Sequence, residues 1–331
     1  MKTSHSLFRA SILFLLCLIF ALSFAAAGYS QESKVSKYPD HPITFIHPLP
    51  AGGADDILTR ALCKEAEKHL GQPIVIINKP GGGLTIGAAA LAASKPDGYT
   101  IGFTAATALL IAPFIEKLPY DPLKDFHQLI NWGAPSFGVT VKTDSAFKSF
   151  KDIVTYARQN PKKLTYGTTG KISLHFLIVE QISRKENIQM TQIPFKGGPE
   201  CETALLGGHV HFAASQFSTT QIEAGNTRLL LLFREERQAE FPNTPVLKDL
   251  GYGDIFAPMV QGIAAPKGIP DEIARKLEEA FTKAAKDPAF IKFTKEQGYL
   301  PLYRNSKESR DYVVKNNEFF GKFLKELGVA K

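Results

Sequence analysis

Gly52 and Gly53 form the most chemically informative pair in this chain, because they stand between a short apolar segment and an amphipathic one. The apolar segment 43–47 predicts a strand. The segment after the glycines predicts a helix, since its apolar residues recur every four positions at Leu58, Leu62, Ala66 and Leu70. A glycine turn that opens a helix lets main-chain N–H groups approach a ligand closely, with the positive end of the helix dipole behind them. The spacing therefore predicts a pocket for an anionic group such as a carboxylate.

The residues around this turn favour binding over catalysis. The chain has no Gly-x-Ser-x-Gly turn, and no Ser or Cys stands at a glycine elbow of that kind. His209 and His211 lie two apart on a predicted strand, but no third metal ligand is spaced near them. We therefore expect no catalytic residue, no metal and no cofactor.

Hydroxyl groups mark two further candidate positions. Thr104 and Thr107 follow a predicted strand at 99–103, and Thr168 and Thr169 follow another at 164–167. A threonine hydroxyl can donate to a carboxylate, but it can equally cap the next helix, and both functions stay open here. For Asp56, in the first turn of the first predicted helix, we expect a structural function rather than ligand contact.

Lys171 is the candidate with the most specific hypothesis. A lysine in the cleft would add a full charge to recognition that otherwise depends on dipoles, and charge-assisted hydrogen bonds are stronger than neutral ones. We hypothesise that Lys171 pairs with the distal carboxylate of a dicarboxylate ligand, the alternative being an ordinary solvated lysine. Lys196 is expected in a salt bridge or at the surface, near the rim of the cleft.

The elements that must position these residues alternate along the chain. Strand patterns near 43–47, 74–77 and 99–103 alternate with helices, and the pattern restarts at 137–141 and continues to 233. The segment from 270 onward is predicted to be nearly all helix, packed back onto the first half. Strands alternating with helices predict βαβ units on parallel sheets, with ligands at the carboxyl ends of the strands. Two lobes are expected, joined near 134–136 and 257–261.

Composition and the N-terminus indicate an exported globular protein. Lys2 and Arg9 precede an apolar stretch at 10–24 and three alanines, which predicts a secretory signal peptide at 1–27, cleaved near Ala27, and a periplasmic location. The net charge is +7, but the basic residues are scattered along the chain with acidic residues between them. Nucleic-acid binding is therefore not expected. Cys63 and Cys201 fall in different predicted lobes, and free thiols are expected for both.

Seven short motifs occur in order along the chain. They are Pro-Leu-Pro-Ala-Gly-Gly at 48–53, Asn-Lys-Pro-Gly-Gly-Gly at 78–83, Lys-Pro-Asp-Gly-Tyr-Thr at 95–100, Leu-Pro-Tyr-Asp-Pro-Leu-Lys-Asp-Phe at 118–126, Pro-Phe-Lys-Gly-Gly at 194–198, Leu-Leu-Gly-Gly-His-Val at 205–210 and Ala-Ala-Pro-Lys-Gly at 264–268. In this register the chain resembles the periplasmic substrate-binding receptors of tripartite tricarboxylate transporters, the Bug family, over essentially its whole mature length.

The resemblance implies a fold, a function and partners. The fold would be an α/β type II periplasmic binding protein, with two α/β lobes and a central cleft joined by two crossover strands. Lobe 1 would comprise 28–134 plus 260–331, and lobe 2 would comprise 135–259. The protein would capture a small organic carboxylate by hinge closure and deliver it to a membrane permease with one large and one small integral subunit. We expect a monomer.

The resemblance also implies site residues. In the family the first-lobe turn and its backbone amides hold a carboxylate, with matching segments in the second lobe. Carried onto this chain, the ligand-binding set is Pro50, Ala51, Gly52, Gly53, Thr104, Thr107, Thr168, Thr169, Lys171, Ser173, Phe195, Gly197, Gly198 and Ser215. The chain departs from the family pattern at Lys171 and at 214–216, so the identity of the carboxylate stays open.

Two other functions remain as alternatives. A ligand-sensing receptor for a membrane sensor kinase would use the same pocket and differ only in its partner. An exported hydrolase would need a nucleophile with a base and an orienting group, and the sequence shows no such set.

Overall fold

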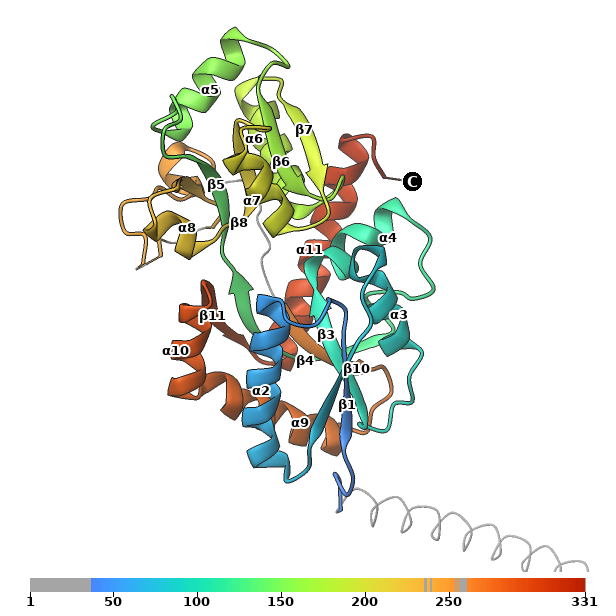
Figure 1. The fold of residues 1–331 in the computed structure, drawn as a ribbon. Helices are drawn as coiled ribbons and strands as arrows, with labels where there is room; N and C mark the ends of the chain where they lie inside the picture. Colours follow the sequence, from blue (N-terminus) through green and yellow to red (C-terminus); the bar gives the residue numbers. More distant parts are fainter. Residues whose placement is uncertain (1–36, 235–236, 239, 254, 256–260, 331) are drawn as a thin grey trace, which may run out of the picture.

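The computed structural model describes residues 37–330 except 235–236, 239, 254 and 256–260. The predicted signal peptide at 1–27 therefore lies outside the described residues. Two β-sheets, each covered by helices, lie one above the other in Figure 1. None of the helices within the described ranges is both long enough and apolar enough to span a bilayer.

The first sheet has six strands in the order β11-β4-β10-β3-β1-β2. Their bounds are β1 Ile43–His47, β2 Ile74–Asn78, β3 Thr100–Ala105, β4 Phe126–Pro135, β10 Gln261–Pro266 and β11 Tyr299–Arg304. β1 pairs in parallel with β2 and β3, as the βαβ pattern predicts, whereas β10 and β11 pair in antiparallel fashion with their neighbours. The prediction of a parallel sheet therefore holds for β1, β2 and β3, but not for β4, β10 and β11. The segment from 270 onward is nearly all helix, as predicted, but it also contains the strand β11.

Among the residues that the structure describes, six α-helices and two short helical turns accompany the first sheet. They are α2 Ala54–Leu70, α3 Thr85–Ala92, α4 Ala112–Ile115, α9 Asp271–Lys286, α10 Pro288–Glu296 and α11 Ser306–Glu326, with η1 Gly82–Leu84 and η2 Thr107–Ile111. α2 shows why these segments fold as predicted. Leu58, Leu62 and Ala66 form its fully buried stripe, and Gly71 ends it in the left-handed conformation with its N–H on the carbonyl of Glu67.

The second sheet has five strands in the order β7-β6-β8-β5-β9. Their bounds are β5 Phe137–Lys142, β6 Thr165–Thr169, β7 Thr191–Phe195, β8 Phe212–Gln216 and β9 Thr227–Leu232. β6 is parallel to β7 and β8, and β5 is antiparallel to β8 and β9. The helices of this part are α5 Phe150–Gln159, α6 Leu174–Glu186, α7 Gly198–Leu206, α8 Thr219–Glu223 and the turn η3 Leu247–Leu250.

The chain passes from the first sheet to the second through Ser136, between β4 and β5. Ser136 is buried, and its hydroxyl donates to Oε1 of Gln238 at 3.0 Å. The other predicted crossing, at 257–261, lies outside the described residues except for Gln261, the first residue of β10. The first sheet takes its strands from 43–135 and 261–304, and the second takes its strands from 137–232.

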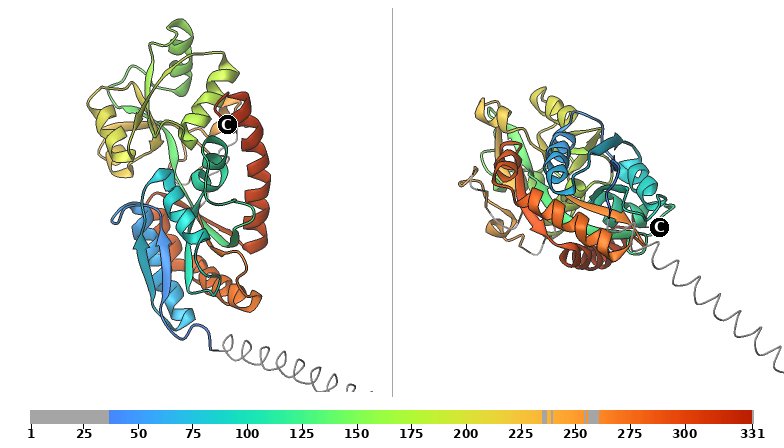
Figure 2. Two further views of the ribbon diagram at one scale, coloured as in Figure 1. Left: turned by 90° about the vertical axis from the view of Figure 1, so that its right-hand side faces the viewer. Right: turned by 90° about the horizontal axis from the view of Figure 1, so that it is seen from below.

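The C-terminal helix α11 contacts both parts of the molecule. It packs against β4 and η2 of the first part. At its other end, Nη1 of Arg184 on α6 donates to the carbonyl of Glu326 at 3.3 Å. Figure 2 shows α11 running along one side of the molecule from the first part to the second. The helical tail thus packs on the first part, as predicted, and also reaches the second.

Gly138 in β5 gives a test of the packing between strands. A Cβ at this position would come within 2.4 Å of the carbonyl oxygen of Leu231 on β9, which is main chain and cannot rotate away. We expect Gly138→Ala to lower the free energy of unfolding by about 1–3 kcal/mol, the usual cost of overpacking. Gly133→Ala is the matched control, because a Cβ in β4 would meet its nearest atom at 3.6 Å. Urea unfolding should separate the two variants, and equal stability would contradict this close approach of β5 to β9.

Candidate functional site

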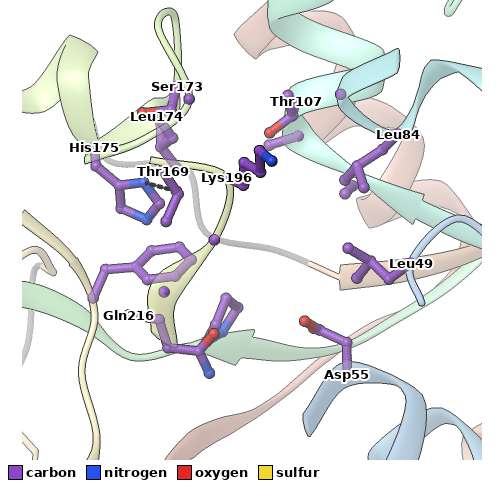
Figure 3. Close-up of a pocket in the computed structure, with 18 of the residues that line it drawn as sticks. Leu49, Asp55, Leu84, Thr107, Thr169, Ser173, Leu174, His175, Lys196 and Gln216 are labelled. Atoms are coloured by element: carbon purple, nitrogen blue, oxygen red, sulfur yellow. Dashed lines mark hydrogen bonds between the residues drawn. The ribbon is translucent and has the colours of Figure 1, made fainter. Parts of the chain in front are cut away.

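A cavity of about 810 Å³ lies between the two sheets. Its wall includes residues that end or directly follow β3, β6, β7 and β8, together with Leu49 after β1 and Gln261 at the start of β10. The carboxyl ends of strands from both sheets therefore meet at this space, where ligands bind in open α/β sheets. Figure 3 shows side chains from both parts facing it.

Six of the predicted binding residues line this cavity. All but one come from the second part of the molecule, and they are Thr107, Thr169, Ser173, Phe195, Gly197 and Gly198. Thr107 is the exception and begins η2, after β3. Ser173 lines the wall while its hydroxyl caps α6, accepting from the N–H of Phe176 at 3.3 Å. These residues stay predictions as ligand contacts, now with a shared location.

The other eight predicted residues do not line this cavity. They are Pro50, Ala51, Gly52, Gly53, Thr104, Thr168, Lys171 and Ser215. Thr168 is fully buried, and its hydroxyl donates to the carbonyl of Gly170 at 3.0 Å. The Ser215 hydroxyl likewise donates to the carbonyl oxygen of Gln216. Lys171 is exposed to solvent and lies outside the wall.

The first glycine turn requires a correction to the prediction that its amides are free for a ligand. The N–H of Gly52 donates to Oδ2 of Asp56 at 2.9 Å, so a protein carboxylate already takes this donor, whereas the N–H of Gly53 has no acceptor within the described part of the chain. Gly52 has a φ of +84°, the left-handed conformation that favours glycine. Asp56 therefore stabilises this turn through its hydrogen bond from Gly52.

Asp56 is the centre of a hydrogen-bonded cluster, as its predicted structural function requires. Its carboxylate accepts from Nε and Nη2 of Arg60 at 2.8 and 3.1 Å, and from Nδ2 of Asn78 at 2.9 Å. Burial alone would raise the pKa of this carboxyl, but the hydrogen bonds from Arg60, Asn78 and Gly52 outweigh it and lower the pKa to about 2.

Lys196 supplies the positive charge of the cavity. Among the described residues of the wall it is the one lysine or arginine, and Asp55 and Glu200 are the carboxylates. Glu200 accepts the main-chain N–H of Lys196 at 2.8 Å, which fixes the loop and leaves the ammonium group available. In Figure 3 the Lys196 side chain lies in the cavity near Thr107. Sequence reasoning placed Lys196 only at the rim, although the neighbouring Gly197 and Gly198 were a signal for a site there.

Gly197 and Gly198 open α7 in the manner predicted for the first turn. Gly197 is the N-cap, no side chain caps the helix, and within the described part of the chain no acceptor lies on the N–H groups of these two glycines. Helix N-termini of this kind bind anions through free N–H groups and the helix dipole. The glycine turn with unused N–H groups that was predicted at Gly52 and Gly53 is therefore found at the β7–α7 junction.

His175 is a buried side chain at the cavity that sequence reasoning did not select. Its Nδ1 hydrogen-bonds the Thr169 hydroxyl at 3.0 Å, and Phe137 packs edge-on against the ring at a centroid distance of 4.2 Å. Its Nε2 is buried and has no partner among the described residues. Burial lowers the pKa of His175 to about 4, so the ring is neutral at pH 7.

His175 predicts a pH dependence of stability. The pKa of His175 is lower in the folded state than its unfolded value near 6.5. Protonation of this side chain therefore favours the unfolded state. The loss starts as the pH falls below 6.5 and is complete below about 4, reaching about 3 kcal/mol. Urea unfolding of wild type and His175→Gln at pH 7.5 and 4.5 should show a smaller pH effect in the variant. An identical pH dependence in both proteins would contradict this burial.

Asp55 lies at the other end of the cavity, in the first turn of α2. Nε2 of Gln261 donates to its Oδ1, and the Tyr299 hydroxyl also hydrogen-bonds it. Nε2 of Gln216, at the end of β8, donates to the Tyr299 hydroxyl at 3.2 Å. This network joins residues from both parts of the molecule. Asp55 precedes the structural Asp56 directly, so sequence reasoning had no ground for separating the two carboxylates.

The rest of the wall is largely apolar. Leu49, Leu84, Phe103, Phe137 and Phe195 all face the cavity. Such a wall can hold an organic ligand by its carbon skeleton while a few polar groups orient it. Among the described residues no group of three His, Cys, Asp or Glu is placed to hold a metal ion, and Cys63 and Cys201 are both buried and free.

Comparison with known proteins gives a consistent result. A family model described as the tripartite tricarboxylate transporter family receptor matches residues 58–329. A Cupriavidus necator protein, described as a UPF0065 protein in the gbd 5′ region, is 35% identical to this chain over 100% of the chain and 99% of its own length.

Solved structures show the same architecture. One described as a periplasmic transporter is 29% identical, covers 88% of this chain and 99% of its own, and gives a TM-score of 0.79. Another, an R. palustris protein with adipate, is 25% identical, covers 88% of this chain and 99% of its own, and gives a TM-score of 0.80.

Proposed function

This chain belongs to the tripartite tricarboxylate transporter receptor family, and we propose that its cavity captures a small organic carboxylate with an apolar carbon skeleton. At the level of the family it is a periplasmic solute-binding receptor and not an enzyme. The observation that carries the proposal is the cavity itself, which combines one ammonium group, a free helix N-terminus and an apolar wall. The R. palustris relative solved with adipate supports a carboxylate as the ligand.

The carboxylate is expected at the β7–α7 junction. Lys196 supplies the charge, and the N–H groups of Gly197 and Gly198 supply directed hydrogen bonds. The first turn of α2 is a poorer position for the same group, because Asp55 and Asp56 place two carboxylates there, whereas the first turn of α7 has one, Glu200, with Lys196 close by in the chain. Thr107, Thr169 and Ser173 would contact the ligand from the surrounding wall.

Closure around the ligand follows from the position of the cavity. A ligand that touches both sheets gains contacts as the parts approach, so it favours the closed arrangement by the free energy of those extra contacts. The passage through Ser136 is one position at which the chain could bend. We further propose that the mature protein begins near Gly28 and that the closed form delivers its ligand to a membrane permease with a large and a small integral subunit.

Calorimetric titration tests this function. We expect at least one member of a panel of mono-, di- and tricarboxylates, including citrate, adipate and benzoate, to bind in the micromolar range or better and to be recovered unchanged by mass spectrometry. A recovered ligand that has been hydrolysed would contradict a binding function. Uptake of the same acid in strains lacking this receptor or the proposed permease would test delivery. Loss of uptake is expected, and retained uptake would contradict it.

A further inference from the structure

The side-chain carboxylate of Asp55 lies in the wall of the same cavity that we propose binds a carboxylate ligand. Within the described ranges it makes no ion pair. Its hydrogen-bond donors, Gln261 and Tyr299, are neutral. Burial raises the pKa of Asp55 despite those hydrogen bonds, which is the cost of a carboxylate without a nearby cation.

Gln261 adds a second unsatisfied acceptor beside Asp55. Its amide nitrogen faces the Asp55 carboxylate, so its oxygen must point elsewhere. Gln261 is 4% exposed, and its Oε1 is buried with no partner in the described part of the chain. A buried acceptor without a donor is costly. Oε1 is closed to solvent in this arrangement, so a ligand supplies that donor once the Gln261 side chain turns its oxygen toward the cavity that it lines.

The charged groups of the cavity are separated. Lys196 comes from the β7–α7 loop and Asp55 from α2, and the two form no ion pair. Figure 3 shows Asp55 beside α2, apart from Lys196. One end therefore offers the Lys196 ammonium group and main-chain N–H groups, beside the carboxylate of Glu200. The other end offers the acceptors Asp55 and Gln261 and has no cation among the described wall residues.

We propose that the ligand is an amino carboxylate, whose carboxylate group binds at Lys196 and whose ammonium group binds at Asp55 and Oε1 of Gln261. This assignment rests on the proposed function and makes it more specific. An ammonium group supplies the cation that Asp55 lacks and the donor that Gln261 lacks. A second carboxylate at the same place would lie against Asp55, and like charges in a closed interface are strongly disfavoured.

Straight-chain pairs of equal length give the test, because they differ only at one end. The probes are 4-aminobutanoate with succinate, 6-aminohexanoate with adipate, and 8-aminooctanoate with suberate. Calorimetric titration of wild type should show that the amino acid of the best-fitting pair binds about tenfold or more tightly than its dicarboxylate. Asp55→Asn should abolish this preference and should bind the dicarboxylate more tightly than wild type does.

The gain of dicarboxylate binding keeps the test independent of folding, since a misfolded variant cannot bind more tightly. Asp271→Asn is the matched control, because Asp271 is an exposed carboxylate in the first turn of α9 and lies outside the cavity. It should leave the preference unchanged. Equal or tighter binding of the dicarboxylates by wild type, with no change in Asp55→Asn, would overturn the amino carboxylate assignment and leave the proposed function standing. If no carboxylate of either panel binds to wild type or to Asp55→Asn, the proposed function itself fails.

Discussion

Lys196→Ala is expected to weaken carboxylate binding by about 10- to 100-fold, because a hydrogen bond to a charged group contributes roughly 1.5–3 kcal/mol. Lys196 is the one lysine or arginine in the described wall of the cavity, so no second cation can replace it there. The loss should appear in the dissociation constant measured by calorimetry, with the thermal stability of the unliganded protein nearly unchanged, because the Lys196 side chain is exposed.

Three further variants make this result specific. Lys196→Arg should retain most of the affinity, since the charge and its donors remain. Lys163→Ala removes an exposed lysine of the second part that is not in the cavity wall, and it should bind like wild type. Lys171→Ala compares the sequence-based hypothesis with the structural one. A larger loss in Lys171→Ala than in Lys196→Ala would show that the carboxylate binds outside the wall described here.

Asp56→Ala is expected to lower the free energy of unfolding by about 2–4 kcal/mol, through loss of a hydrogen-bonded buried carboxylate. Asp56 is 2% exposed and accepts from Gly52, Arg60 and Asn78. The Arg60 side chain is 47% exposed, so its freed charge can be hydrated, and the cost stays below that of a fully buried pair.

Urea unfolding of Asp56→Ala against Asp271→Ala measures this effect. Both variants remove a carboxylate from the first turn of a helix, but Asp271 is exposed and should cost at most about 0.5 kcal/mol. Equal stability of the two variants would mean that the Asp56 cluster does not hold the first turn.

Local patterns were sufficient to predict most helices and strands. The amphipathic helix expected after Gly53 is present as α2, and the helical segment expected from 270 onward contains α9, α10 and α11. The strands β4, β10 and β11 were not predicted from their patterns, because tertiary pairing determines them. β4 is buried along nearly its whole length, so it shows no alternation, and β11 contains Pro301. The direction of β10 depends on the return of the chain from the second part, which no local window contains.

For the site, the chemistry was easier to predict than its location. A glycine pair before a helix predicts an anion site, and that pattern occurs both at Gly52 and at Gly197. Only the structure shows that Asp56 occupies the first turn, whereas the second lies at the cavity. The positions of Asp55, His175 and Gln261 also depend on tertiary packing, since these residues come from α2, α6 and β10.

A crystal structure with the tightest-binding carboxylate tests the central claim most directly. We expect the ligand in the cavity between the two sheets, with a carboxylate oxygen within hydrogen-bond distance of Nζ of Lys196 and of a main-chain N–H at Gly197 or Gly198. A carboxylate bound instead at the turn formed by 50–53, or outside the cavity, would contradict the account.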